Sequence, residues 1–327
     1  MIIVRSPYRI SLLGGGSDYP NYIAKHGSGY SIGFTIDKYS YVAAKILPSF
    51  FPYKSKFTYS ETETVDHNIL VKHQAIWHTI QECGVMDLPL EVNHFSDIPS
   101  NSALGSSSAF LLSLVAALNL LKTRCYLDKE TLLRLAVKIE RQYSTVGWQD
   151  AALSSMGGFN FFEFTENGIQ RRMSYSCGLE PMQKYGLLFY LNEPRTSSAI
   201  VNTYYKHLTE DPCQKEIANL AVKGEQILRR SYHHGFDFEQ FCELIKKSWQ
   251  LKRSLSHNIM TKKVYTIQDG LIDYYKAFRL LGSGGGGSIF FLAEPETHNF
   301  IKSYCEELGC IHIPYKIDYS GTKVIQE

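Results

Sequence analysis

The sequence lacks both a clear excess of one charge and a long hydrophobic run. Its 34 Lys and Arg residues nearly balance 32 Asp and Glu residues, and no basic run or acidic tail occurs. This pattern gives no reason to expect a nucleic acid or a membrane surface as a partner. The longest apolar stretch, residues 109–121, contains Ser113 and Asn119 and is shorter than the roughly 20 residues of a membrane span. It predicts a buried helix instead.

The sequence also lacks paired cysteines and the features of a secreted protein. Its seven cysteines are scattered without a CxxC pair, which argues against a disulfide framework and a zinc site. The N-terminus, MIIVRSPYRI, leads directly into a strand-like pattern and shows no charged start followed by the apolar core of a signal peptide. A cytoplasmic protein is therefore expected, as a monomer or a homodimer.

Residue patterns predict two regions that each mix helices and strands. With 327 residues, of which 44% are hydrophobic, the chain can fill two ordinary domains. A change of character near residues 180–190 divides it into residues 1–185 and 186–327. Strands are predicted from residue 2, at 90–95, 187–191 and 288–292, in a strand–turn–strand unit at 30–47 and in a hairpin at 159–175. Helices are predicted at 106–122, at 128–143 with Asp128 as its cap, and from about residues 197, 214, 238 and 262.

The strongest chemical signal is the segment PSNSALGSSSA from Pro99 to Ala109, between a predicted strand and the predicted central helix. Backbone N–H groups at a helix start bind anions, and the positive end of the helix dipole adds to the attraction. Serine hydroxyls there can also bind Mg²⁺, which prefers oxygen ligands. The alternative is a serine cap on an ordinary helix, but three consecutive serines exceed what a cap needs. The segment predicts phosphate binding without the Gly-Lys-Ser/Thr ending of a Walker A loop.

A glycine cluster, LGSGGGG at residues 281–287, leads directly into the predicted strand 288–292. Consecutive glycines cost backbone entropy that a simple turn does not require, and they allow a backbone to approach a ligand or another loop closely. The alternative is a flexible linker, which does not usually lie between an amphipathic helix and a buried strand. A dinucleotide-binding turn is excluded, because such a turn follows a strand and opens a helix.

A third glycine segment, Gly14-Gly-Gly-Ser-Asp-Tyr19, follows the first predicted strand and Arg9. Glycines beside a carboxylate and an arginine can bind sugar hydroxyls, although an ordinary turn is the alternative. Two further carboxylates are Glu140, near the end of the predicted helix 128–143, and Asp150, which follows in Val146-Gly-Trp-Gln-Asp150. Phosphoryl transfer to an alcohol needs a metal at the phosphates and a group that orients or deprotonates the hydroxyl. These two carboxylates are the candidates, with simple solvation of each as the alternative.

Together these segments resemble the kinase superfamily of galactokinase, homoserine kinase, mevalonate kinase and phosphomevalonate kinase, the GHMP kinases. The superfamily's three motifs match Pro7 to Tyr19, Pro99 to Ala109 and Gly282 to Gly287 in the same order. Ala103 stands where the superfamily usually has glycine.

Within the superfamily, the chain resembles most the D-glycero-D-manno-heptose 7-phosphate kinases. The resemblance lies in Gly14-Gly-Gly-Ser-Asp18 and in Val146-Gly-Trp-Gln-Asp150 followed by Gly157-Gly. Arg195-Thr-Ser-Ser and Trp249-Gln-Leu-Lys-Arg253 match weaker signatures. Trp148 and Arg279 stand where lysine is more usual.

The resemblance implies an α+β fold of two domains and assigns roles to residues. The N-terminal domain would contain a left-handed βαβ crossover and the C-terminal domain would be a ferredoxin-like α/β unit. Asp150 would act on the acceptor hydroxyl, Arg9 would position that hydroxyl or lower its pKa, and Ser107 and Glu140 would hold Mg²⁺. The residues expected at ATP are Pro99, Ser102, Leu104, Gly105, Ser106, Ser107 and Ser108. The residues expected at the sugar substrate are Gly15, Gly16, Ser17, Asp18, Tyr19, Arg195, Lys252, Arg253, Gly284, Gly285 and Gly286.

The resemblance also implies an ATP-dependent and Mg²⁺-dependent sugar kinase. The expected reaction phosphorylates the anomeric hydroxyl of D-glycero-D-manno-heptose 7-phosphate and gives the 1,7-bisphosphate. Arg195, Lys252 and Arg253 are the cations expected to meet the acceptor's phosphate. Other acceptors, namely fucose, galactose or a uronic acid, stay open, as does a non-catalytic relative that senses ATP and sugar.

Overall fold

The computed structural model describes residues 1–193, 211–255 and 259–327. The predicted helix near residue 197 and the predicted substrate ligand Arg195 lie outside these described residues.

The first sheet is built around two long antiparallel strands, β1 (Ile2–Leu13) and β2 (Gly29–Ile46). Its order is β12-β1-β2-β5-β3-β4, and β6 pairs with the first part of β2 while β7 pairs with β6. These further strands are β3 (Ser55–Thr58), β4 (Thr62–Val65), β5 (Leu90–Ser96), β6 (Phe159–Thr165), β7 (Gly168–Ser174) and β12 (Lys323–Gln326). The parallel neighbours β3 and β5 are connected through β4, η1 (Asn68–Leu70) and α2 (Gln74–Glu82), which forms the crossover of a βαβ unit.

The prediction of a strand, a turn and a second strand at 30–47 is wrong, because β2 is one continuous strand. Residues 29–34 pair with β6 and residues 40–46 pair with β5, while β1 pairs along most of its length. The polar pair Asp37-Lys38 does not form a turn. Instead, the backbone of Asp37 donates to the Lys316 carbonyl at 2.8 Å, and its carboxylate accepts from the Lys316 N–H at 2.8 Å.

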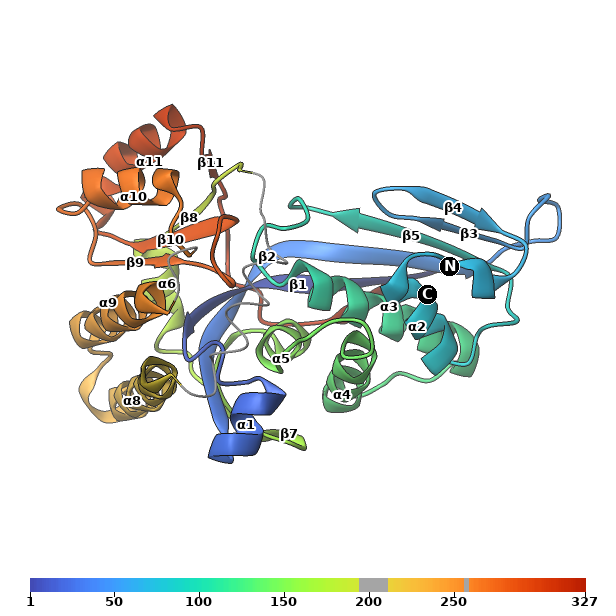
Figure 1. Cartoon of the computed structure of the whole chain (residues 1–327), viewed down its shortest axis with the longest axis horizontal. Helices are drawn as coiled ribbons and strands as arrows, with labels where there is room; N and C mark the ends of the chain where they lie inside the picture. Colours follow the sequence, from blue (N-terminus) through green and yellow to red (C-terminus); the bar gives the residue numbers. More distant parts are fainter. Residues whose placement is uncertain (194–210, 256–258) are drawn as a thin grey trace.

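A layer of helices covers one face of this sheet (Figure 1), with α3 (Ser106–Thr123) at its centre. It packs against β1, β2, α2, α4 (Lys129–Glu140) and α5 (Gln149–Met156), which explains why its sequence is apolar on nearly every side. Asp128 caps α4 by accepting from the N–H groups of Glu130 and Thr131, as predicted. Among the described residues α3 is also the one helix long and apolar enough to cross a membrane, but its side chains form part of the protein core.

The second sheet has the strand order β11-β8-β10-β9, with every neighbouring pair antiparallel. In chain order this is the 4-1-3-2 arrangement of a ferredoxin-like unit. The strands are β8 (Gly186–Tyr190), β9 (Ala277–Leu280), β10 (Ser288–Leu292) and β11 (Ile311–His312). The helices of this region are α6 (Leu179–Tyr185), α8 (Pro212–His234), α9 (Phe238–Ser254), α10 (Lys262–Gly270) and α11 (His298–Glu307), with the turn η3 (Pro295–Thr297). The predicted fold class is confirmed.

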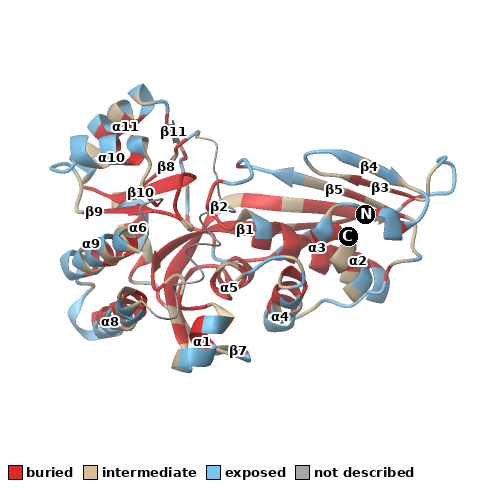
Figure 2. Cartoon of the chain, viewed as in Figure 1, coloured by how far each residue is buried: buried red, intermediate tan, exposed pale blue. Residues whose placement is uncertain are grey.

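The two sheets share a buried core and a chain crossing. Phe34 of β2, Phe159 of β6, Phe241 of α9 and Phe290 of β10 belong to one apolar cluster. The central strands β1, β2 and β10 are mostly buried, whereas β4, β7 and the outer helix faces are largely exposed (Figure 2). After β11 the chain returns to the first sheet as β12, so both termini lie in the same half of the molecule (Figure 1). The predicted boundary falls at Gly186, the first residue of β8, and the division into two domains stays a prediction.

Candidate active site

A cleft of about 430 Å³ brings together the three glycine and serine segments that the sequence singles out. Arg9, Gly15, Gly16, Asp18 and Tyr19 line it from the first segment, and Gly105 and Ser106 to Ser108 line it from the start of α3. The start of α5 contributes Gln149 and Asp150, and the C-terminal half contributes Lys252, Arg279, Gly282 and Ser283. Segments as far apart in the chain as Arg9 and Ser283 therefore form one site.

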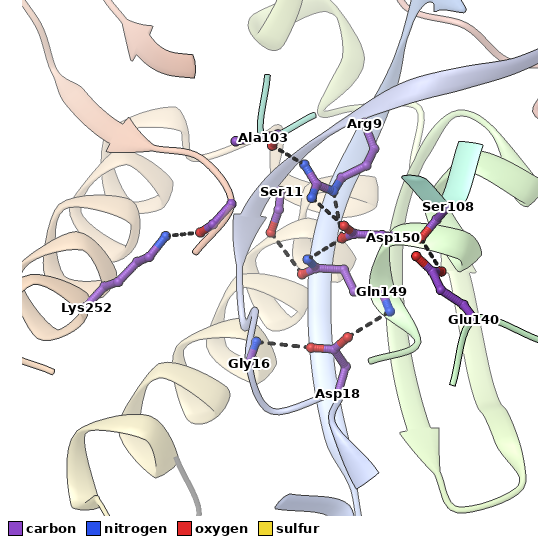
Figure 3. A network of polar contacts seen from close by, with 11 residues as sticks. Arg9, Ser11, Gly16, Asp18, Ala103, Ser108, Glu140, Gln149, Asp150 and Lys252 are labelled. Carbon is purple, nitrogen blue, oxygen red and sulfur yellow. Dashed lines mark hydrogen bonds and ion pairs between the residues drawn. The ribbon is translucent and has the colours of Figure 1, made fainter. Parts of the chain in front are cut away.

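Asp150 and Arg9 form a two-pronged ion pair at the centre of this cleft (Figure 3). Arg9 Nε donates to Asp150 Oδ1 at 2.8 Å, and Arg9 Nη2 donates to Oδ2 at 2.6 Å. Arg9 Nη1 donates to the Ala103 carbonyl at 2.7 Å, so the same side chain also holds the loop before α3. Asp150 keeps a third of its side chain exposed, whereas Arg9 is buried. The pair therefore presents a carboxylate of fixed orientation to the cleft.

Two residues that the sequence analysis did not select, Gln149 and Ser11, extend this network. Ser11 Oγ donates to Gln149 Oε1 at 2.9 Å, and Gln149 Nε2 donates to Asp150 Oδ1 at 3.1 Å. Gln149 thus adds a second donor to the carboxylate that Arg9 holds. The signal in the sequence is a polar residue next to Asp150, between Trp148 and the apolar run Ala151-Ala-Leu153.

Asp18 joins the first glycine segment to the start of α5. Its carboxylate accepts from the N–H of Gly16 at 3.0 Å and from the N–H of Gln149 at 2.8 Å. Burial raises the pKa of Asp18, although these N–H donors favour its charged form. Gly15, Gly16 and Tyr19 line the cleft beside it, while Ser17 lies behind them and donates to the carbonyls of Gly14 and Tyr30.

The predicted metal ligands meet at one end of the cleft, where α3 begins and α4 ends. Ser108 Oγ donates to Glu140 Oε2 at 2.9 Å, and Ser107 also hydrogen-bonds this carboxylate. Burial raises the pKa of Glu140 to about 7, which the two serine hydroxyls partly oppose and the charge of Asp150 reinforces.

This end fits Mg²⁺ because its donors are all oxygens. No group of three or more His, Cys, Asp or Glu side chains suited to a metal occurs in the part of the chain that the structure describes. A cation here would therefore take its other ligands from water and nucleotide phosphates, as Mg²⁺ commonly does.

The loop before α3 depends on left-handed backbone at alternate residues. Asn101, Ala103 and Gly105 have φ values of 65°, 64° and 78°. Ala103 thus adopts a conformation that favours glycine, which explains why glycine is usual there in the GHMP kinases. Three residues expected at ATP do not line the cleft: Pro99 is exposed, and Ser102 and Leu104 are buried behind the loop.

The residues of the glycine cluster that line the cleft are not the ones predicted. Gly282 and Ser283 line the cleft, whereas Gly284, Gly285 and Gly286 do not. The Gly285 N–H donates to the Ile259 carbonyl at 3.1 Å. The cluster also contacts the loop before α3, since Ser288 Oγ donates to the Ser102 carbonyl at 2.7 Å.

The cations expected to meet the acceptor phosphate lie in different surroundings. Lys252 is buried and lines the cleft. Arg253 does not line it and donates instead to Gln268 of α10 at 3.4 Å. Arg195 lies outside the described residues. Arg279, which the sequence analysis noted only as a departure from the resemblance, is buried and lines the cleft.

Comparison with known proteins agrees with this fold. The sequence matches the GHMP kinases N terminal domain family over residues 68–158 and the GHMP kinases C terminal family over residues 227–309, together more than half of the chain. It is 26% identical to a D-glycero-alpha-D-manno-heptose 7-phosphate kinase of Campylobacter jejuni, over 98% of this chain and 97% of that protein.

Two further comparisons are more distant. The chain is 24% identical to an L-fucokinase/L-fucose-1-P guanylyltransferase of Bacteroides fragilis, over 63% of this chain and 22% of that protein. The crystal structure of a D-glycero-D-manno-heptose 1-phosphate kinase from Bacteroides thetaiotaomicron superposes with a TM-score of 0.78 at 18% identity, covering 100% of this chain and 99% of that one. The structural likeness shows the shared fold. The chain belongs to the GHMP kinase family and is a sugar kinase, a phosphotransferase whose acceptor is an alcohol group.

Proposed function

We propose that this kinase transfers the γ-phosphate of ATP to the anomeric hydroxyl of D-glycero-D-manno-heptose 7-phosphate and yields the 1,7-bisphosphate. The observation that carries the proposal is the Arg9–Asp150 pair beside the serine-rich start of α3. The similarity to a heptose 7-phosphate kinase over nearly the whole of both chains supports this acceptor.

Asp150 would act as the base for the acceptor hydroxyl. The hydroxyl proton moves to the Asp150 carboxylate, the oxygen bonds to the γ-phosphorus, and the bond to the β-phosphate oxygen breaks to release ADP. Arg9 and Gln149 would hold the carboxylate in a fixed orientation toward the hydroxyl. Such positioning reduces the entropy that the reacting groups would otherwise lose in the transition state.

The ATP phosphates would lie at the start of α3. The first N–H groups of a helix have no partner within the helix, and the dipole there favours negative charge. Ser106 to Ser108 line the cleft at this point. Ser107 and Glu140 would hold Mg²⁺, which when bound neutralises charge on the phosphates.

Fucose is the second candidate acceptor, because the fucokinase relative also matches. That match covers 63% of this chain, whereas the match to the heptose 7-phosphate kinase covers 98%. The buried cations Lys252 and Arg279 in the cleft also favour a phosphorylated acceptor over a neutral sugar. A non-catalytic sensor is less well supported, since Ser107, Glu140 and Asp150 all occur in or beside the cleft.

We further propose a cytoplasmic enzyme, monomeric or homodimeric, whose partners are ATP and a sugar phosphate. All seven cysteines are free thiols, which is consistent with a reducing compartment.

A screen of ADP release over candidate acceptors tests the proposal. The compared substrates are heptose 7-phosphate, free heptose, mannose, galactose, fucose and a uronic acid, with ATP saturating. We expect the highest kcat/KM for heptose 7-phosphate and a new anomeric phosphate in the ³¹P NMR spectrum of its product. A free hexose or fucose that exceeds it by tenfold or more would contradict the heptose assignment and leave the kinase chemistry in place.

A further inference from the structure

The charged side chains of the cleft are arranged in a definite order. Glu140 lies at one side of Asp150 and Lys252 lies at the other, as Figure 3 shows. The serine-rich start of α3 is on the Glu140 side, where Ser108 contacts this carboxylate. The end suited to a metal and the end that carries cations are therefore separated by the Arg9–Asp150 pair.

Arg279 belongs to the cationic end, because of its position in β9. Phe278 and Leu280 of this strand pack into the core beneath α10 and α11, so Arg279 between them faces the opposite side of the sheet. There its Nη1 donates to Ser248 Oγ of α9 at 3.0 Å. Arg279 is only 4% exposed and yet lines the cleft. Its guanidinium is thus held by the second sheet and presented to the site.

Lys252 lies one helical turn after Ser248 on α9, next to Arg279. Its Nζ donates to the Leu280 carbonyl at 3.1 Å and to the Gly282 carbonyl at 2.5 Å. These contacts fix the chain that leads from β9 into the glycine cluster. They also bring Gly282 and Ser283 to the cleft wall beside the two cations.

This combination suits a phosphate group better than a sugar hydroxyl. A phosphate monoester carries close to two negative charges near neutral pH and accepts several hydrogen bonds. An arginine can meet it with a planar fork of donors, and a lysine adds a point charge. A seven-carbon sugar phosphorylated at carbon 7 carries its phosphate at the end opposite its anomeric carbon. With the anomeric hydroxyl at Asp150, that phosphate would reach away from the α3 end.

We infer that Arg279, together with Lys252 and Ser283, binds the terminal phosphate of the acceptor and thereby selects a phosphorylated sugar. The inference rests on the proposed function and specifies which residues of the site carry its selectivity. Arg279 takes the role that the sequence analysis gave to Arg253. Binding at this remote phosphate also holds the anomeric hydroxyl at Asp150, so its loss lowers kcat as well as affinity.

The test compares Arg279→Gln with wild type on heptose 7-phosphate and on free heptose. Losing a charge-assisted contact to the phosphate should raise the KM for heptose 7-phosphate by about 10- to 100-fold. The kcat/KM for free heptose and the KM for ATP should each stay within about twofold. Arg279→Lys should keep part of the preference for the phosphorylated sugar, because the positive charge remains.

Two controls separate this role from damage to the fold. Arg172→Gln removes an exposed arginine that does not line the cleft, one whose Nε donates to Asn160 in the first sheet, and should leave the preference unchanged. Inorganic phosphate should inhibit wild type in competition with heptose 7-phosphate and not with ATP, a measurement that needs no variant.

The inference is wrong if Arg279→Gln keeps the wild-type preference for heptose 7-phosphate over free heptose within twofold. It is also wrong if the KM of this variant for ATP rises as much as its KM for heptose 7-phosphate. Inhibition of wild type by inorganic phosphate in competition with ATP alone would equally contradict it. Wild type that prefers an unphosphorylated sugar would instead contradict the proposed function itself.

Discussion

Burial raises the pKa of Glu140 to about 7, so this carboxyl group changes its charge within the physiological pH range. The raised value means that the metal-free fold favours the protonated form. The contribution of protonated Glu140 to the free energy of unfolding is therefore present at pH 5 and is lost as the pH rises through about 7. A cation at the α3 end needs the opposite form, because only the ionised carboxylate binds it well.

The first prediction follows from this conflict. At saturating ATP, the Mg²⁺ concentration for half-maximal rate should rise as the pH falls from 8 to 6, by about tenfold per unit below pH 7. Glu140→Gln should raise that concentration and remove its pH dependence, whereas Ser107→Ala should raise it and keep the dependence. Identical Mg²⁺ titrations for wild type and both variants would mean that the metal is held elsewhere.

Site residues that lie in short, recognisable motifs could be predicted from the sequence. Arg9, Asp18, Ser107, Glu140 and Asp150 all occur at the cleft or contact residues that line it. Arg9, Asp18, Ser107 and Asp150 lie in short motifs whose residue types indicate the chemistry, and the family resemblance added Glu140, so no tertiary information was needed to select them.

The residues that were missed or misplaced depend on tertiary neighbours. Arg279 acquires its position from the alternation of side chains in β9, and Gln149 from the carboxylate beside it. Lys252 and Arg253 were predicted together, but consecutive residues of a helix point in directions about 100° apart. Lys252 is therefore buried at the cleft while Arg253 contacts α10.

At the level of elements, the sequence predicts those with a long and regular pattern. The helix at α3, the capped helix α4 and the hairpin of β6 and β7 are confirmed. The helix α5 was not predicted, because its eight residues are nearly all buried and show no polar face. The prediction placed a turn inside the long strand β2. The strand continues there because Asp37 pairs with Lys316, almost 280 residues away, and this contact cannot be seen in the local sequence.

The contact between the glycine cluster and the loop before α3 gives a second prediction. Gly287 has φ of 96°, and a Cβ there would lie 2.6 Å from the Ala103 Cβ and 3.1 Å from the Ser102 carbonyl oxygen. Gly287→Ala should therefore displace the loop that carries the α3 start, raise the KM for ATP several-fold and destabilise the fold by about 1–3 kcal/mol. Thermal unfolding and ATP titration of the purified variant measure both effects.

Gly286 offers a matched control for this substitution. Its φ of 121° also disfavours a side chain, but a Cβ there meets no atom within 4 Å. Gly286→Ala should thus show only the backbone cost and a smaller change in KM for ATP. Equal effects of the two substitutions would show that the contact with Ala103 has no influence on the nucleotide site.

At the scale of the whole molecule, the cleft requires both halves of the chain. The N-terminal sheet and its helices supply the α3 start, Glu140 and Asp150, and the ferredoxin-like half supplies Lys252, Arg279 and Ser283. The shared core and the return of the chain from β11 to β12 connect the two halves. Asp150 lies where these contributions meet, at the centre of the cleft.

The turnover of Asp150→Asn therefore shows whether this carboxylate acts on the acceptor hydroxyl. Asparagine keeps the shape of the side chain and can still accept a hydrogen bond from Arg9, but it cannot take a proton from the acceptor hydroxyl. With folding checked by thermal unfolding, we predict a fall in kcat of about 10²- to 10⁴-fold, with the Kd for ATP within about twofold of wild type. A kcat within threefold of wild type would contradict the assignment of Asp150 as the group that acts on the acceptor.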